Sequence, residues 1–318
     1  MANEDDEIER KVKAVVPPGI ALQVLAAKYQ RTSATPAIRI MTPAYPTWLA
    51  RMDPNLDLNS AEAIKESVKA FMSWRKNYHE KMSDLIDGTN GINFYDTGSA
   101  LIVAISRSGK ALYLQPYTIF GAKGRIGAGA ATLHDDERLN GTSVGMPHYS
   151  PDGKRLPGSG TGEGADSVVI FSPETWDTPE AKKVFTGPGT AKDEILFHEM
   201  VHALRLMTGT LHAMPVSQGY EHEEEYLAIV LTNVYMSEKR QTDFRARHTR
   251  PNIKLQQPEK FLDNVQGVDL PPIVMIERFR LSNPGFYKAY ADIPASSAAF
   301  NPVREFRERD RAGKIKRK

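Results

Sequence analysis

The sequence predicts an α+β domain that contains two functional helices and a small mixed or antiparallel sheet. Three observations support this fold class. The motif His-Glu-Met-Val-His occupies residues 198–202, inside a stretch that contains no glycine or proline. A second stretch, 219–235, begins with acidic residues and continues as an almost wholly apolar run. A run rich in valine and isoleucine at 166–172 precedes both, and β-branched residues favour strands.

The residues that flank the motif delimit the first helix. Thr190 with Asp193 three residues later is typical of an N-cap followed by an acid at the third helical position. Gly209 lies where a C-terminal cap is expected. Apolar residues recur between these ends at helical spacing, which predicts that much of the helix is buried. They are Leu196, Met200 or Val201, and Leu204.

The motif itself predicts a zinc site. His198 and His202 are four residues apart, so both imidazoles point the same way and can bind one Zn²⁺. Glu199 between them can polarise a water molecule for hydrolysis. The alternative is a chance match on an ordinary helix. With 8 histidines in 318 residues, a random chain would contain the motif roughly one time in a hundred.

A catalytic zinc site takes three protein ligands and leaves a fourth position open. A third histidine, six residues after His202 with a glycine halfway, is excluded because Arg205 and Thr208 stand at those positions. A glutamate from a second helix is the other common solution. The stretch 219–235 offers an acidic cluster in its first turn, where the helix dipole favours negative charge. All four of its glutamates cannot bind one metal ion, so most are expected to be solvated.

Segments 198–209 (HEMVHALRLMTG) and 223–238 (EEEYLAIVLTNVYMSE) resemble the gluzincin-type metallopeptidases of bacterial toxins and secreted effectors. This group includes the anthrax lethal factor catalytic core and effectors of type III and type VI secretion systems. The resemblance covers about residues 160–248 and implies a zincin-like fold. It implies Glu225 as the third ligand, because 225–228 matches the second-helix motif of lethal factor. Alignment with clostridial neurotoxin proteases would instead make Glu224 the ligand and Glu225 its support, and Glu221 is a weaker candidate.

Several nearby residues are candidates for supporting roles. A peptidase must stabilise the oxyanion that forms on the substrate carbonyl. The same resemblance implies a tyrosine for this, and Tyr220 is the candidate. Arg245 and His248 can reach the cleft as an electrophile and a supporting donor, or can belong to a basic surface loop. His212 and His222 are expected to be loop histidines rather than ligands.

The run at 166–172 follows a glycine-rich loop at 158–164 and predicts a strand. In zincin folds a strand lies along the cleft above the zinc helix, and its free edge holds the substrate as an added strand. We expect this role for residues 167–172. The alternative is an internal strand that does not touch the substrate.

Composition limits the classes of protein that need to be considered. The chain has 41 Lys+Arg against 39 Asp+Glu, and a net charge of +2 does not favour a nucleic-acid partner. The chain contains no stretch of 18 apolar residues, so we expect no membrane span. Cysteine is absent, which suits a reducing compartment. The first ten residues lack signal-peptide features. Together with the resemblance to secreted effectors, these features imply synthesis in a bacterial cytoplasm and delivery to a target cell by a specialised secretion system.

Proline and charge patterns divide the chain into three parts. Residues 1–50 are expected to be an N-terminal arm for export or docking, with a short helix near 20–28. Residues 51–300 are expected to form the catalytic domain, with its core at 160–250. The last part, 301–318, is expected to be a solvated charged tail.

Further elements are expected within the catalytic part. Residues 59–88 and 273–281 predict helices. The apolar runs 100–105 and 111–114, on either side of a turn, predict a hairpin. The glycine-rich segment 121–129 superficially resembles a phosphate loop but lacks the Gly-Lys-Ser/Thr ending.

The sequence as a whole predicts a zinc-dependent endopeptidase. The expected partners are a protein or peptide substrate, with a secretion-machine component and an immunity protein if the chain is a toxin. Two alternatives stay open. One is a zinc amidase or deacylase that acts on a non-protein target such as peptidoglycan. The other is a secretion-associated binding module whose site has become inactive.

Overall fold

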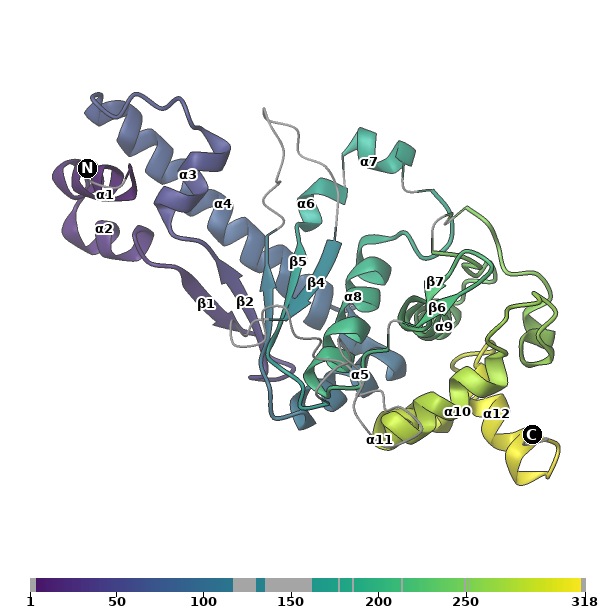
Figure 1. Ribbon diagram of the computed structural model, residues 1–318. Helices are drawn as coiled ribbons and strands as arrows, with labels where there is room; N and C mark the ends of the chain where they lie inside the picture. The colour runs from purple at the N-terminus through teal and green to yellow at the C-terminus, as the bar shows by residue number, and fades with distance from the viewer. Residues whose placement is uncertain are drawn as a thin grey trace.

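A computed structural model describes residues 4–116, 130–134, 162–176, 178–184, 186–212, 214–248, 250 and 252–315. It confirms the α+β class, with many helices around one small mixed sheet (Figure 1). The strands are β1 (Lys28–Arg31), β2 (Ile38–Thr42), β3 (Leu112–Gln115), β4 (Ala130–His134), β5 (Ser167–Phe171), β6 (Pro215–Val216) and β7 (Glu221–His222). The helices are α1 (Glu4–Val15), α2 (Pro18–Val24), α3 (Tyr45–Met52), α4 (Ala61–Asp87), α5 (Asp96–Arg107), α6 (Pro173–Trp176), α7 (Pro179–Val184), α8 (Lys192–Met207), α9 (Glu223–Glu238), α10 (Pro272–Ser282), α11 (Pro284–Asp292) and α12 (Pro302–Arg311).

The main sheet has the strand order β1-β2-β3-β5-β4. Its three inner strands are parallel to one another, and the two outer strands run antiparallel to their neighbours. Helix α8 packs against β4 and β5, and α9 packs against α8. Strands β6 and β7 form a separate hairpin that leads into α9. Helices α8 and α9 thus lie at the β4 side of the sheet.

The strand expected at 167–172 is present as β5, but the prediction that one of its edges is free is wrong. Strand β5 pairs with β3 on one side and with β4 on the other. Four of its five residues are buried, which is typical of an internal strand covered on both faces. The alternative of an internal strand is therefore correct. Among the described strands, β4 takes the edge position beside α8.

The hairpin predicted at 100–114 is also wrong. Residues 100–105 lie in α5, and β3 pairs in parallel with β2 and β5. A short apolar run fits a helix as well as a strand, and here Leu101, Ile102 and Ile105 are buried at helical spacing. Glu238 of α9 accepts hydrogen bonds from the backbone N–H of Asp96 at 2.6 Å and of Thr97 at 3.0 Å. The first N–H groups of a helix have no partner within the helix, and Glu238 accepts two of them here. The contact therefore stabilises the start of α5.

Residues 4–50 form helices and strands that pack with the rest of the chain. The expected short helix lies at 18–24 as α2, and β2 lies inside the sheet rather than in a separate arm. Helices α1 and α3 bury apolar side chains against the first half of α4, in a cluster distinct from the main core. The second half of α4 joins the main core. The long helix α4, predicted at 59–88, thus connects the two apolar clusters (Figure 1).

The C-terminal part differs from the expected solvated tail. Helix α12 buries Val303 and Phe306, which are three residues apart and so share one face of a helix that is otherwise charged. Helix α10 confirms the prediction at 273–281. The segment 121–129 lies outside the described residues.

A buried histidine of α4 makes stability depend on pH. His79 is 4% exposed, and its Nε2 lies 3.3 Å from Thr42 Oγ1. Burial, together with the nearby charges of Lys28 and Arg75, lowers the pKa of His79 to about 4. The imidazole therefore stays neutral in the folded protein at pH values where it is charged in the unfolded chain, whose histidine pKa is about 6.5.

We expect this histidine to destabilise the protein in acid. The free energy of unfolding that His79 contributes is fully present above about pH 6.5. It decreases as the pH drops towards 4, by up to about 3 kcal/mol in total. Urea unfolding of wild type and of His79→Gln at several pH values between 7 and 4 measures it. The difference in unfolding free energy between the two proteins should shrink in acid. A difference independent of pH would contradict the prediction.

Candidate metal centre

The N-cap of α8 is Ala191, one residue later than the expected Thr190. The backbone N–H of Ala191 donates to Glu194 Oε2 at 3.1 Å, so the acid at the third helical position is Glu194 rather than Asp193. Thr190 does not cap the helix, because its hydroxyl donates to the carbonyl of Gly187. The physical device is the expected one, an acid that satisfies a free N–H in the first turn.

The end of α8 is held by close backbone contact. Gly209 has a φ of +66°, as expected for a residue that follows a helix. A Cβ on Gly209 would lie 2.3 Å from the carbonyl oxygen of Gly162, and one on Gly164 would lie 2.0 Å from that of Met207. The described end of the glycine-rich loop therefore packs directly on the end of α8, which only glycine permits.

Three side chains of α8 and α9 converge on one point. His198 Nε2 and His202 Nε2 are 3.0 Å apart. Glu225 Oε2 lies 3.0 Å from His198 Nε2, and Glu225 Oε1 lies 3.4 Å from His202 Nε2. Ligand atoms bound tetrahedrally to zinc at about 2.0–2.1 Å are about 3.3 Å apart. The buried group of two histidines and one glutamate can therefore hold a metal ion.

The charges of this group also suit a cation. Burial lowers the pKa of His198. Burial also acts to lower the pKa of His202, but Glu224 and Glu225 outweigh it and raise that pKa. Burial acts to raise the pKa of Glu225, yet hydrogen bonds with both histidines hold it below its usual value. Two imidazole nitrogens this close need a proton or a cation between them.

Glu199 lies close enough to affect the same site electrostatically. It is only partly buried on α8, in contrast to the two motif histidines. Burial lowers the pKa values of His198 and Arg245, and the negative charge of Glu199 opposes that effect. The same charge adds to the raised pKa of His202. The motif thus places a carboxylate, more open to solvent than the histidines, beside the converging ligand atoms.

The β6–β7 hairpin and a histidine set the position of Glu225. His222 is the N-cap of α9, and its Nδ1 accepts the backbone N–H of Glu225 at 3.3 Å. This contact puts Glu225 in the first turn of α9, facing α8. As expected, His222 is not in the group of three, and the structure assigns it a capping role instead.

Glu224 points away from the group of three and towards Arg205. Arg205 Nε lies 2.7 Å from Glu224 Oε2 and 3.0 Å from Oε1, and Asn283 accepts a further hydrogen bond from Arg205 at 2.8 Å. Glu224 Oε1 also lies 3.5 Å from His202 Nδ1. A carboxylate behind a metal-binding histidine orients its ring. Sequence reasoning used Arg205 only to exclude a third histidine, although an arginine on a buried helix itself indicates a carboxylate partner.

His248 lies beside the group of three. The alternative that its segment is only a basic surface loop is therefore wrong. Its Nε2 is 3.4 Å from Glu225 Oε2, and its ring is parallel to that of His198 with 6.2 Å between centroids. Its Nδ1 is 3.2 Å from Glu221 Oε2, and Glu221 is 46% exposed and does not join the group. Arg245 is buried and donates to the carbonyls of Arg247 and His248, so it holds this loop in place.

Tyr220 and His212 lie outside the group. Tyr220 is 1% exposed, its ring packs 4.2 Å from that of Tyr226, and burial raises its pKa. His212 Nδ1 lies 2.7 Å from Glu223 Oε2, which also pairs with Arg278. The prediction that His212 is not a ligand agrees with this placement.

Comparison with known proteins does not identify a relative. No family model, curated protein or solved structure matches the chain. Among the described residues, no helix is both long enough and apolar enough to cross a membrane. The function must therefore be argued from the geometry of the site.

Proposed function

We propose that this chain is a zinc-dependent endopeptidase with a zincin-like catalytic domain. One observation carries the proposal. The Nε2 atoms of His198 and His202 and the carboxylate of Glu225 approach one another within 3.0–3.4 Å, and Glu199 stands between the two histidines in the chain. Two imidazoles and one carboxylate form a ligand set typical of catalytic zinc.

Each residue has a defined part in the proposed hydrolysis. A zinc ion held by His198, His202 and Glu225 would supply a Lewis acid and an activated water. Glu199 accepts the proton of the attacking water and passes it to the leaving amine. Glu224 keeps His202 oriented. Tyr220 has no part in this scheme, because its ring is almost fully buried against Tyr226.

The substrate side of the proposal changes with the observed sheet. The strand expected to hold the substrate was β5, but among the described strands β4 lies at the edge of the sheet and packs beside α8. An extended peptide can add to such an edge through main-chain hydrogen bonds. We therefore place the substrate along β4. The toxin or effector role, the delivery system and an immunity partner stay predictions that depend on the resemblance alone.

Metal analysis combined with a substrate survey tests the proposal. We expect about one zinc ion per chain and cleavage of a mixed peptide library that stops with a chelator and returns with added zinc. Peptidoglycan fragments serve as the second substrate in the same assay. Cleavage of these fragments without cleavage of peptides would favour the amidase alternative. Cleavage of peptides that continues after the metal is removed would contradict the proposal.

A further inference from the structure

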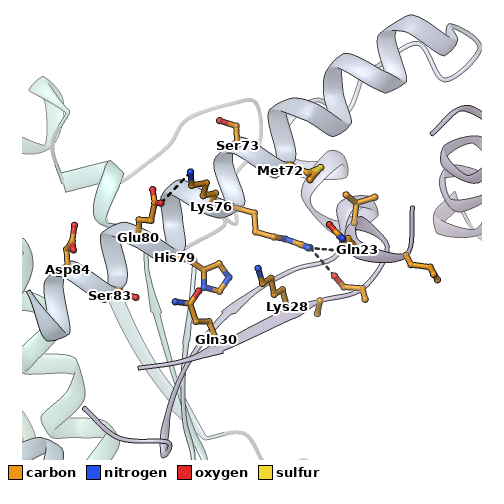
Figure 2. A pocket seen from close by; sticks show the side chains of 15 residues that line it. Gln23, Lys28, Gln30, Met72, Ser73, Lys76, His79, Glu80, Ser83 and Asp84 are labelled. Atoms are coloured by element: carbon orange, nitrogen blue, oxygen red, sulfur yellow. Dashed lines mark hydrogen bonds and ion pairs between the residues drawn. The ribbon is translucent and has the colours of Figure 1, made fainter. Parts of the chain in front are cut away.

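A groove with a volume of about 1090 Å³ lies between α4 and the segment that joins α2 to β1 (Figure 2). It lies at the β1 edge of the main sheet, whereas α8 packs against β4 and β5 at the opposite edge. The groove is therefore separate from the candidate metal centre, and it needs its own explanation.

Two buried side chains that line the groove have unsatisfied nitrogen atoms. His79 is 4% exposed and Arg75 is 6% exposed. Arg75 donates through its two terminal nitrogens to the carbonyls of Gln23, Ala26 and Pro43, but its Nε has no hydrogen-bond partner. Nδ1 of His79 has none either. A buried polar atom without a partner is costly, and the wall of the groove holds two of them.

One wall of the groove is a sheet edge with free backbone groups. Within the described part of the chain, β1 pairs only with β2. The N–H of Thr32 donates to Ile38, so the antiparallel alternation directs the backbone groups of Gln30 towards β2. Those of Tyr29 and Arg31 then point to the free side. Such an edge is a template for another strand.

The sign of the charge changes along the groove. Arg75 and Lys76 of α4, together with Lys28 of β1, line it nearer to the start of α4. In Figure 2 the side chain of Lys76 is turned towards Glu80. Glu80 and Asp84 lie further along α4. The ion pair of Lys76 with Glu80 is long, at 3.7 Å, and both side chains are largely exposed. An occupant that carries carboxylates nearer to the start of α4 would complement these cations.

We propose that this groove binds an extended acidic peptide segment of a partner protein, which adds to the free edge of β1 as a further strand. Its backbone would pair with Tyr29 and Arg31. Side chains on its inner face would enter the groove, where a carboxylate can meet Lys28 and Lys76. Strand addition supplies affinity through the main chain, and the side-chain pockets supply specificity. The proposal does not depend on activity at the metal centre.

Selection from a library tests the occupant. The full chain is immobilised and exposed to random octapeptides, and the best binder is then labelled for fluorescence anisotropy. We expect enrichment of Asp and Glu at alternate positions and depletion of proline, because alternate residues of a strand face the same side. Enrichment of basic peptides, or no enrichment, would overturn the proposal.

Variants then test the two parts of the proposal. Lys76→Glu should weaken binding of the labelled peptide at least about tenfold, because it reverses a charge in the groove. Lys69→Glu is the matched control, since Lys69 also lies on α4 but outside the groove, with its side chain 79% exposed. Equal weakening by both variants would show that only the overall charge matters, which overturns the site.

Tyr29→Pro removes one outward N–H without breaking the β1–β2 pairing, since proline is tolerated at a strand edge. It should also weaken binding at least about tenfold. A copy of the peptide that is N-methylated at alternate amides makes the same test on the unaltered protein. Unchanged affinity for that copy in both methylation registers would overturn strand addition, whether or not the Tyr29 variant folds.

Discussion

If the chain is the proposed zinc peptidase, we expect the Glu199→Gln variant to hydrolyse peptides about 10²–10⁴-fold more slowly than the wild type and to keep the same zinc content. Glutamine has nearly the same shape but cannot take a proton from water. Glu199 is not one of the three converging groups, so its loss removes no metal ligand. The effect should appear in kcat rather than in metal affinity, because the lost interaction acts only on the transition state.

Hydrolysis of one library-derived peptide, measured with zinc content in the same samples, checks this expectation. Glu66→Gln is a suitable control, because it removes one negative charge from an exposed position of α4. Full activity of the Glu199 variant would disprove the proposed mechanism. Loss of zinc together with activity would instead place Glu199 among the ligands.

The neighbouring residues Glu224 and Glu225 should give different results when each is replaced by alanine. Glu225→Ala removes one of the three converging groups, so we expect zinc to be lost. In the metal-free protein this variant should lose less stability than Glu224→Ala, because the Glu225 side chain is 14% exposed and that of Glu224 only 1%. Glu224→Ala leaves Arg205, which is 3% exposed, without its carboxylate. An uncompensated buried charge of this kind costs about 3–5 kcal/mol of unfolding free energy.

Zinc content and urea unfolding in the presence of a chelator separate the two effects. The chelator removes the contribution of the metal, so unfolding then reports on Arg205 and its partners alone. Glu221→Ala is the control, because Glu221 is 46% exposed and lies next to His248. Zinc loss confined to the Glu224 variant would support the alternative alignment in which Glu224 is the ligand.

Much of the fold near the site is predictable from local patterns. Helix α8 is correctly predicted by three signals, which are a stretch without glycine or proline, apolar residues at helical spacing and the glycine at position 209. Similar signals predict α4 and α10. The same reasoning fails at 100–105, where six apolar residues fit a strand and a helix equally well. The contact between Glu238 and the first turn of α5 favours the helix. The sequence separation between Glu238 and its two partners is 142 and 141 positions, so local patterns do not contain this information.

For the candidate site, the sequence by itself determines which donors α8 presents and how they are spaced. Helical periodicity puts His198 and His202 one turn apart on one face, whatever surrounds them. Only the tertiary structure decides between Glu224 and Glu225. Adjacent residues of a helix point about 100° apart, so the angle at which α9 packs on α8 selects the one that meets the histidines. Strand β5 is internal for a comparable reason, because it pairs with both β3 and β4 and neither partner adjoins it in the sequence.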